Sequence, residues 1–158
     1  MKIALGNDHA AVELKKYLVE KITAAGHEVI DVGVNSTESV DYPVYGAAGA
    51  HEVAQGRADR ALLICGTGVG IGISANKVPG IRCAICSEPY SAEMSRRHND
   101  ANALAIGARV VGPDLAWMIV ETWLAAEYEG GRHDRRVELI NDLDGDTPDT
   151  TEVPRCPA

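Results

Sequence analysis

Residues 60–72 read Arg60-Ala61-Leu62-Leu63-Ile64-Cys65-Gly66-Thr67-Gly68-Val69-Gly70-Ile71-Gly72, an apolar run of strand length that ends on a cysteine and continues as a glycine loop. Glycine stands at every second position of this loop, so backbone N–H groups can approach an anion without a Cβ atom in the way. In an open α/β sheet, ligands bind at the carboxyl ends of the strands. Cys65 is therefore placed either as a catalytic thiol or as a small buried residue before a tight turn.

Strand and helix patterns alternate on both sides of this loop. Short apolar runs predict strands, and apolar residues at helical spacing predict helices. The predicted strands are residues 2–5, 28–32, 60–65, 82–86 and 104–106, and the predicted helices are residues 10–25, 44–55, 71–77, 89–98, 114–126 and 132–143. This alternation with short loops indicates an α/β fold in which helices cover both faces of a parallel five-stranded sheet.

The length of 158 residues fits one domain of ordinary size. We expect this domain to span residues 1–143. Residues 144–158 contain Pro, Asp, Thr and Gly without periodicity, which predicts a mobile C-terminal tail.

The composition excludes several classes of protein. A net charge of −8 argues against a nucleic-acid-binding surface and against binding to anionic membranes. No apolar stretch approaches the roughly 20 residues that span a bilayer. The apolar part of the N-terminus is too short for a signal peptide, so we expect a cytoplasmic protein.

The four cysteines do not have the spacing of a disulfide scaffold. Cys83 and Cys86 form a C-x-x-C pair, but they lie in a predicted strand and no second pair exists. We therefore expect neither a metal site nor a redox site there.

The glycine loop does not fit the common nucleotide-binding motifs. A dinucleotide fingerprint requires G-x-G-x-x-G, and its last position is Ile71 when counted from Gly66 or Ile73 when counted from Gly68. A Walker A loop requires Gly-Lys-Ser/Thr, whereas Lys77 follows Asn76. Both nucleotide interpretations fail on spacing.

Eight ordered segments carry a resemblance to a known family. They are Gly6-Asn7-Asp8-His9, Asp41-Tyr42-Pro43, Ile64 to Gly70, Ser74-Ala75-Asn76-Lys77, Ser87 to Ala92, Arg97-His98-Asn99-Asp100, Gly107 to Gly112 and Tyr128-Glu129-Gly130-Gly131-Arg132-His133. In these segments the chain resembles the type B ribose-5-phosphate isomerases, a family that also includes galactose-6-phosphate and allose-6-phosphate isomerases. The resemblance implies a Rossmann-like three-layer α/β/α sandwich and no metal or cofactor. It also implies a homodimer, with a tetramer left open, whose active sites use residues from both chains.

The resemblance implies that Cys65 is the catalytic base. Aldose–ketose isomerisation moves a proton between C1 and C2 of an open-chain sugar, and a thiol near cations or a helix N-terminus can accept it. Some family members carry a glutamate base just after the glycine loop instead, but Ile71 stands at that position here. The cysteine version of the family is the one that fits.

The loop and one histidine supply the other catalytic groups. The enediolate oxygen would face the backbone N–H groups of Gly66, Thr67, Gly68, Val69 and Gly70. The Thr67 hydroxyl can pass a proton between the two sugar oxygens, or it can cap the next helix. His98, beside Asn99, is the candidate for ring opening, because imidazole can take and give a proton near physiological pH.

The substrate-binding residues follow from the same resemblance. Asp8 can bind sugar hydroxyls, and His9 would lie near the phosphate or the sugar ring. Tyr42 could line the pocket, or Asp41-Tyr42-Pro43 could be a turn that leads into a helix.

Arginine matches phosphate bidentately, and the resemblance gives this role to Arg109, Arg132 and Arg136. Arg132 and Arg136 are four residues apart and would share one helix face. His133 lies beside Arg132 in the sequence, but the sequence alone does not place it relative to the phosphate.

We therefore expect an isomerase that interconverts ribose 5-phosphate and ribulose 5-phosphate through an enediolate. Its partners would be a small phosphorylated sugar and a second copy of the chain, with no nucleic acid and no membrane. One alternative is an isomerase of another phosphosugar, such as an allose, galactose or four-carbon ketose phosphate. Another is a sugar-phosphate-binding subunit that has lost catalysis.

Overall fold

The sheet at the centre of the fold has five parallel strands. The computed structural model describes residues 1–145. In the sheet order, the strands are β2 (Glu28–Asp31), β1 (Lys2–Asn7), β3 (Arg60–Cys65), β5 (Ala103–Gly107) and β4 (Cys83–Ile85). All four neighbouring pairs are parallel. The predicted α/β fold is confirmed.

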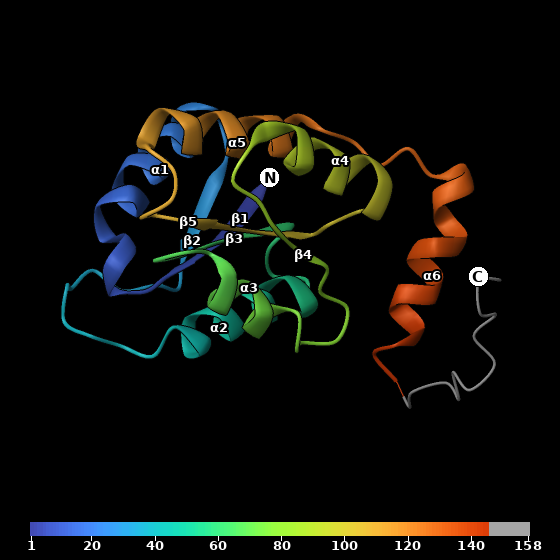
Figure 1. Cartoon of the computed structure of the whole chain (residues 1–158), viewed down its shortest axis with the longest axis horizontal. Coiled ribbons are helices and arrows are strands. Elements are labelled where there is room, and N and C mark those ends of the chain that lie inside the picture. The colour runs from blue at the N-terminus through green and yellow to red at the C-terminus, as the bar shows by residue number, and fades with distance from the viewer. Residues whose placement is uncertain (146–158) are drawn as a thin grey trace, which may run out of the picture.

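Helices cover both faces of this sheet and make a three-layer sandwich (Figure 1). On one face lie α1 (Val12–Ala24), α4 (Pro89–Asn99) and α5 (Pro113–Ala125). On the other face lie α2 (Tyr42–Ala54) and α3 (Val69–Ala75). The last helix, α6 (Asp134–Asp142), stands apart from these layers in Figure 1.

Each face of the sheet has its own hydrophobic core, because successive side chains of a strand point to opposite faces. From β3, Leu62 and Ile64 point to the α1–α5 side, where Trp123 is fully buried. Leu63 and Cys65 point to the α2–α3 side. Burial on both faces explains why β3 is a continuous apolar run rather than an alternating one.

Several helix boundaries differ from the predicted ones. The predicted helix 10–25 divides into a 3-10 turn (His9–Ala11) and α1, because the Asp8 carboxylate caps the turn by accepting from Ala10 N. Helix α2 begins at Tyr42, so Pro43 occupies its first turn, where a missing N–H costs nothing.

Helix α3 begins at Val69, two residues before the predicted start, because the chain turns at Gly68. The predicted helix 132–143 is a 3-10 turn (Gly131–His133) followed by α6. Arg132 and Arg136 therefore lie in different elements, although they are four residues apart in sequence.

The strand order creates a switch point between β1 and β3. After β1 the chain moves outward to β2, and then it crosses back to place β3 on the other side of β1. Crevices at such points bind ligands beyond the carboxyl ends of the strands. The segment after β1 and the glycine loop after β3 meet at this place, and Asp8 N donates to Ile64 O over 3.1 Å.

The predicted tail, residues 144–158, lies outside the described residues apart from its first two. Asp144 accepts a hydrogen bond from Gly80 N over 2.6 Å. Within residues 1–145, none of the helices combines the length and the apolar character needed to cross a membrane.

Replacing Trp123 with alanine (Trp123→Ala) should lower the free energy of unfolding by about 3–5 kcal/mol, because it empties the largest buried side-chain volume of the core. Urea denaturation followed by far-ultraviolet circular dichroism measures this loss. Trp117→Ala is the matched control, since Trp117 is only partly buried at the edge of the same core. A loss at Trp117 equal to that at Trp123 would contradict the assignment of the core.

Candidate active site

The glycine loop holds a backbone conformation that a side chain would prevent. Gly68 has a φ of 80°, in the left-handed region. A Cβ atom added there would lie 2.8 Å from the carbonyl carbon of Ile106 in β5. The loop therefore passes directly against the end of a neighbouring strand, and glycine is required at this position.

Cys65 lies at the base of this loop, with 4% of its surface exposed. Its Sγ accepts a hydrogen bond from Gly68 N over 3.2 Å, and its carbonyl accepts one from Ala108 N over 2.8 Å. The sulfur is thus fixed between the loop and the segment that follows β5. The exposed Thr67 accepts a hydrogen bond from Val69 N over 3.3 Å.

Two further predicted residues border the loop. A Cβ atom added at Gly70 would lie 2.6 Å from Tyr42 Cζ, so the phenol ring packs directly on the loop backbone. A Cβ atom added at Gly66 would lie 3.6 Å from Arg109 Nη1, so the guanidinium also borders it. Arg109 N donates to Gly66 O over 3.0 Å, which ties the two loops together.

Asp8 and His9 follow β1 at the same edge of the sheet. Asp8 is 5% exposed, and its Oδ1 accepts a hydrogen bond from Ala10 N over 2.9 Å. His9 Nδ1 accepts one from Val40 N over 3.2 Å. The structure thus brings one group of predicted residues together: Asp8, His9, Tyr42, Cys65, Gly66, Thr67, Gly68, Val69, Gly70 and Arg109.

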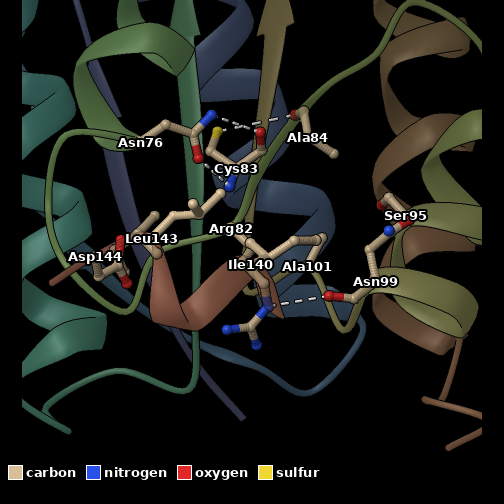
Figure 2. A pocket seen from close by; sticks show the side chains of 11 residues that line it. Asn76, Arg82, Cys83, Ala84, Ser95, Asn99, Ala101, Ile140, Leu143 and Asp144 are labelled. Carbon is tan, nitrogen blue, oxygen red and sulfur yellow. Dashed lines mark hydrogen bonds between the residues drawn. The ribbon is translucent and has the colours of Figure 1, made fainter. Parts of the chain in front are cut away.

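The remaining predicted residues lie at the opposite edge of the sheet. Helix α4 starts after the carboxyl end of β4 and runs back to Asn99, just before β5 begins. Asn99 O accepts from Arg82 Nε over 3.0 Å, and Arg82 immediately precedes β4 (Figure 2). The six residues of β3 span roughly 20 Å at ~3.3 Å each, so His98 does not reach Cys65 of the same chain. Arg132 and Arg136 lie near His133, whose ring stacks on His98, so they are on the same side of the molecule as His98.

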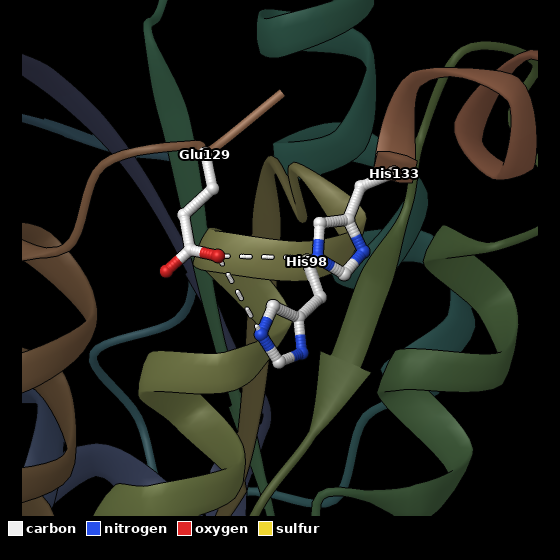
Figure 3. A group of neighbouring side chains, drawn as sticks. All are labelled: His98, Glu129 and His133. Atoms are coloured by element: carbon white, nitrogen blue, oxygen red, sulfur yellow. Dashed lines mark ion pairs between the residues drawn. The ribbon is translucent and has the colours of Figure 1, made fainter. Parts of the chain in front are cut away.

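A carboxylate and two imidazoles form a cluster at this opposite edge (Figure 3). The rings of His98 and His133 are stacked, with centroids 4.4 Å apart and planes within 9°. Glu129 Oε2 lies 3.9 Å from Nε2 of each ring. The sequence contained Glu129 and His133 within one recognised segment, but only the packing of the Tyr128–His133 segment against α4 gives them a position.

Arginines surround this cluster and set its charges. Hydrogen bonds from Arg97 are the main reason that the pKa of Glu129 is lowered, and the nearby His98 and His133 add to the effect. Burial is the main reason that the pKa of His133 is lowered, with repulsion from His98, Arg132 and Arg136 in addition. The carboxylate is therefore ionised and the buried imidazole is biased toward its neutral form.

Within the described residues 1–145, His98, Glu129 and His133 form the group of side chains that could hold a metal ion, since their donor atoms lie within 4.8 Å of one another. Two histidines and a glutamate are a donor set that zinc uses. Here the donors are already engaged: Arg97 binds the Glu129 carboxylate, and Arg132 Nε donates to His133 Nε2 over 3.3 Å. A cation bound to His133 Nε2 would have to displace Arg132.

Cys83 and Cys86 are poor ligands, because burial raises their pKa values to about 12 and about 11. A metal site of the C-x-x-C type would require thiolates, which these values disfavour at neutral pH.

A separate cavity of about 490 Å³ lies between β4, the end of α4 and the end of α6 (Figure 2). Its lining is mixed, with Ile81, Ala84, Ile140 and Leu143 beside Arg82. Asn99 is the one predicted site residue in this lining. The cavity therefore belongs to neither the glycine loop nor the histidine cluster.

Residues 3–140 match a family model described as Ribose/Galactose Isomerase. Ribose-5-phosphate isomerase B of Escherichia coli is 56% identical over 143 residues, which cover 90% of this chain and 96% of that protein. D-erythrulose-4-phosphate isomerase of Pectobacterium atrosepticum is 43% identical over 141 residues, or 89% of this chain and 93% of that protein. The solved structure of Clostridium thermocellum ribose-5-phosphate isomerase B superimposes with a TM-score of 0.90 at 54% identity, covering 91% of this chain and 97% of that chain.

Two glycine substitutions should separate backbone strain from steric conflict. Gly80 has a φ of 82° with nothing within 4 Å of an added Cβ, so Gly80→Ala should cost about 1–2 kcal/mol from the left-handed backbone alone. Gly68→Ala carries the same strain plus the conflict with Ile106 and should lower the free energy of unfolding further. Chemical denaturation of both variants measures the difference. Equal losses would mean that the loop is free to move away from β5.

Proposed function

Because this chain belongs to the ribose/galactose isomerase family, we propose that it interconverts ribose 5-phosphate and ribulose 5-phosphate. The observation that carries this proposal is the position of Cys65, buried at the switch point of the sheet with a glycine loop folded over its sulfur. Such a site can bind a small anion and present one thiol to it. A cytoplasmic location belongs to the same proposal, since phosphorylated pentoses are made and used inside cells.

Cys65 acts as the base in the proposed reaction. Its sulfur takes the proton from C2 of the open-chain aldose, and the C–H electron pair forms the C1–C2 double bond while O1 becomes an oxyanion. The same thiol then returns the proton to C1, and the O2 hydroxyl proton moves to the O1 oxyanion as the ketone forms at C2. C2 is oxidised while C1 is reduced within the same sugar, so the reaction requires no external oxidant or reductant.

The glycine loop stabilises the enediolate in this scheme. The turn at Gly68 fixes the loop backbone, with the Gly68 N–H on Cys65 Sγ and the Val69 N–H on Thr67 Oγ1. The other N–H groups of the loop would face the enediolate oxygen as charge develops on it. The exposed Thr67 hydroxyl can carry the proton between O1 and O2. Asp8, His9 and Tyr42 border the space beyond the loop, where the sugar hydroxyls would lie.

A second copy of the chain completes the proposed site. His98, Asn99, Arg132 and Arg136 lie at the edge of the sheet opposite Cys65, so one chain cannot offer both groups to one sugar. A homodimer in which the His98 edge of one protomer faces the Cys65 edge of its partner would unite them. His98 would then open the sugar ring, and Arg132 and Arg136 would join Arg109 as phosphate anchors.

An isomerase of another phosphosugar is the second candidate. The 43% identity with the Pectobacterium D-erythrulose-4-phosphate isomerase favours a four-carbon substrate within the same chemistry. A shorter sugar would place its phosphate at a different distance from Cys65, so the position of the arginines decides between the two.

A substrate panel on the wild type and on Cys65→Ala tests the function directly. We expect the highest kcat/KM for ribose 5-phosphate over allose 6-phosphate, galactose 6-phosphate and erythrose 4-phosphate. Cys65→Ala should keep its circular dichroism spectrum and lose at least about 10²-fold in kcat, because it lacks the base. Near-wild-type turnover by this variant would remove Cys65 from the reaction. Binding of the phosphosugars by the wild type without turnover would instead support a non-catalytic subunit.

Mixing two inactive variants tests the shared site. In a heterodimer of Cys65→Ala and His98→Asn, one site contains both changes and the other contains neither. Random reassortment of equal amounts should therefore recover about a quarter of wild-type activity, whereas each variant alone stays inactive. Mixing each variant with itself is the control. No recovery in a sample that forms mixed dimers would mean that each site uses residues of one chain.

A further inference from the structure

The Glu129 carboxylate faces the Nε2 atoms of two stacked imidazoles and is itself held by Arg97. Arg97 Nε donates to Glu129 Oε1 over 2.6 Å, and Glu129 N donates to Arg97 O over 3.0 Å. These bonds join the segment before α6 to α4 and leave Oε2 facing the two Nε2 atoms, each 3.9 Å away. Figure 3 shows both rings and the carboxylate converging on this point.

We propose that Glu129 is the positioning residue of His98, with its carboxylate fixing both the orientation of the imidazole and the ring nitrogen that carries the proton. This role presupposes the ring opening assigned to His98 above. Within one chain, Glu129 lies at the end of the sheet opposite Cys65, on the same side as His98.

The position of the carboxylate decides which nitrogen of His98 is available to the sugar. A negative charge 3.9 Å from Nε2 favours the neutral tautomer that carries its N–H at that atom, through electrostatic attraction rather than a direct hydrogen bond. Nδ1 then keeps its lone pair in the neutral ring. In ring opening, Nδ1 takes the proton of the O1 hydroxyl, the C1–O4 bond breaks with its electron pair on O4, and Nδ1 returns the proton to O4.

The surrounding charges make this carboxylate necessary. His133 stacks on His98, Arg132 and Arg136 lie near His133, and Arg97 binds Glu129, so cations surround this cluster. Glu129 is the acidic group whose attraction raises the pKa of His133 against burial and these cations. The same carboxylate faces His98 Nε2 over 3.9 Å.

The stack itself restricts the ring. His133 is 5% exposed, whereas the His98 side chain is 34% exposed. A partly exposed imidazole at the end of a helix would otherwise rotate about its side-chain bonds. Contact with a buried ring on one side and a fixed carboxylate at Nε2 leaves one orientation.

Glu129→Gln tests the proposal, since it keeps the shape and removes the charge. On ribose 5-phosphate, kcat should fall about tenfold, less than the ~10²–10⁴-fold contributed by the acid–base group itself. KM should change by less than about twofold, because the phosphate anchors stay in place. Glu129→Asp, which keeps the charge on a shorter side chain, should recover part of the rate.

Two readouts separate positioning from a structural role. Ribulose 5-phosphate carries its phosphate on O5 and therefore stays open-chain. The entry of solvent deuterium at its C1 thus reports proton transfer without ring opening. Glu129→Gln should leave the rate of this deuterium entry unchanged. The pKa of His133, followed by nuclear magnetic resonance of the ring, should fall in Glu129→Gln because the carboxylate that favours the charged form is gone. Glu93→Gln is the matched control, since Glu93 is the other carboxylate that binds Arg97.

Each outcome decides the question. Wild-type kcat with an unchanged His133 pKa in Glu129→Gln would overturn the proposal. An equal loss of kcat in Glu93→Gln would also overturn it, because Glu129 would then only anchor Arg97. An equal loss in the rate of deuterium entry in Glu129→Gln would overturn it as well, because Glu129 would then support the whole site. If the wild type does not turn over ribose 5-phosphate, the proposed function fails, whereas the His133 titration still measures what Glu129 does to the histidines.

Discussion

The close approach of the Gly68 backbone to the end of β5 is the constraint on which the rest of the active-site geometry depends. The loop can turn within three residues of Cys65 because Gly68 adopts a positive φ and has no Cβ to meet Ile106. That turn aims the Gly68 N–H at the Cys65 sulfur and starts α3 at Val69. It also leaves room for the Tyr42 ring over Gly70 and for the Arg109 side chain over Gly66. The thiol, the loop amides and two binding side chains thus depend on one backbone turn.

The direction of α4 explains why the candidate residues form two groups. A helix that follows a parallel strand must run antiparallel to it before the next strand can begin. The start of α4 is therefore near the carboxyl edge of the sheet, and His98 in its last turn is near the amino edge. Because parallel topology imposes this separation, no local adjustment of side chains could bring His98 to Cys65. The proposed association of two chains would bring the two groups together, as the family resemblance implies.

Charge in this protein is organised locally rather than over the whole surface. The net charge is −8, yet Arg97, Arg132 and Arg136 gather around His98 and His133. Such a concentration of cations suits a phosphate and disfavours a metal ion. Burial, with repulsion from Arg132 and Arg136 in addition, lowers the pKa of His133, and the Glu129 carboxylate offsets part of this effect. In the proposed site, one carboxylate would therefore link the phosphate anchor to the ring-opening group.

The sequence by itself determined the elements and the chemistry. Apolar runs bounded by glycine predicted all five strands, most clearly β1, β3 and β5, which are buried on both faces and so are apolar. The spacing of the glycines excluded nucleotide motifs, and, within the family that the chain resembles, Ile71 favoured Cys65 as the proposed base. Tertiary structure alone decided the order of the strands, the separation of Cys65 from His98, and the meeting of Glu129 with two histidines. These features depend on contacts between segments far apart in the chain, such as α4 with the segment before α6, and no local pattern of residues records them.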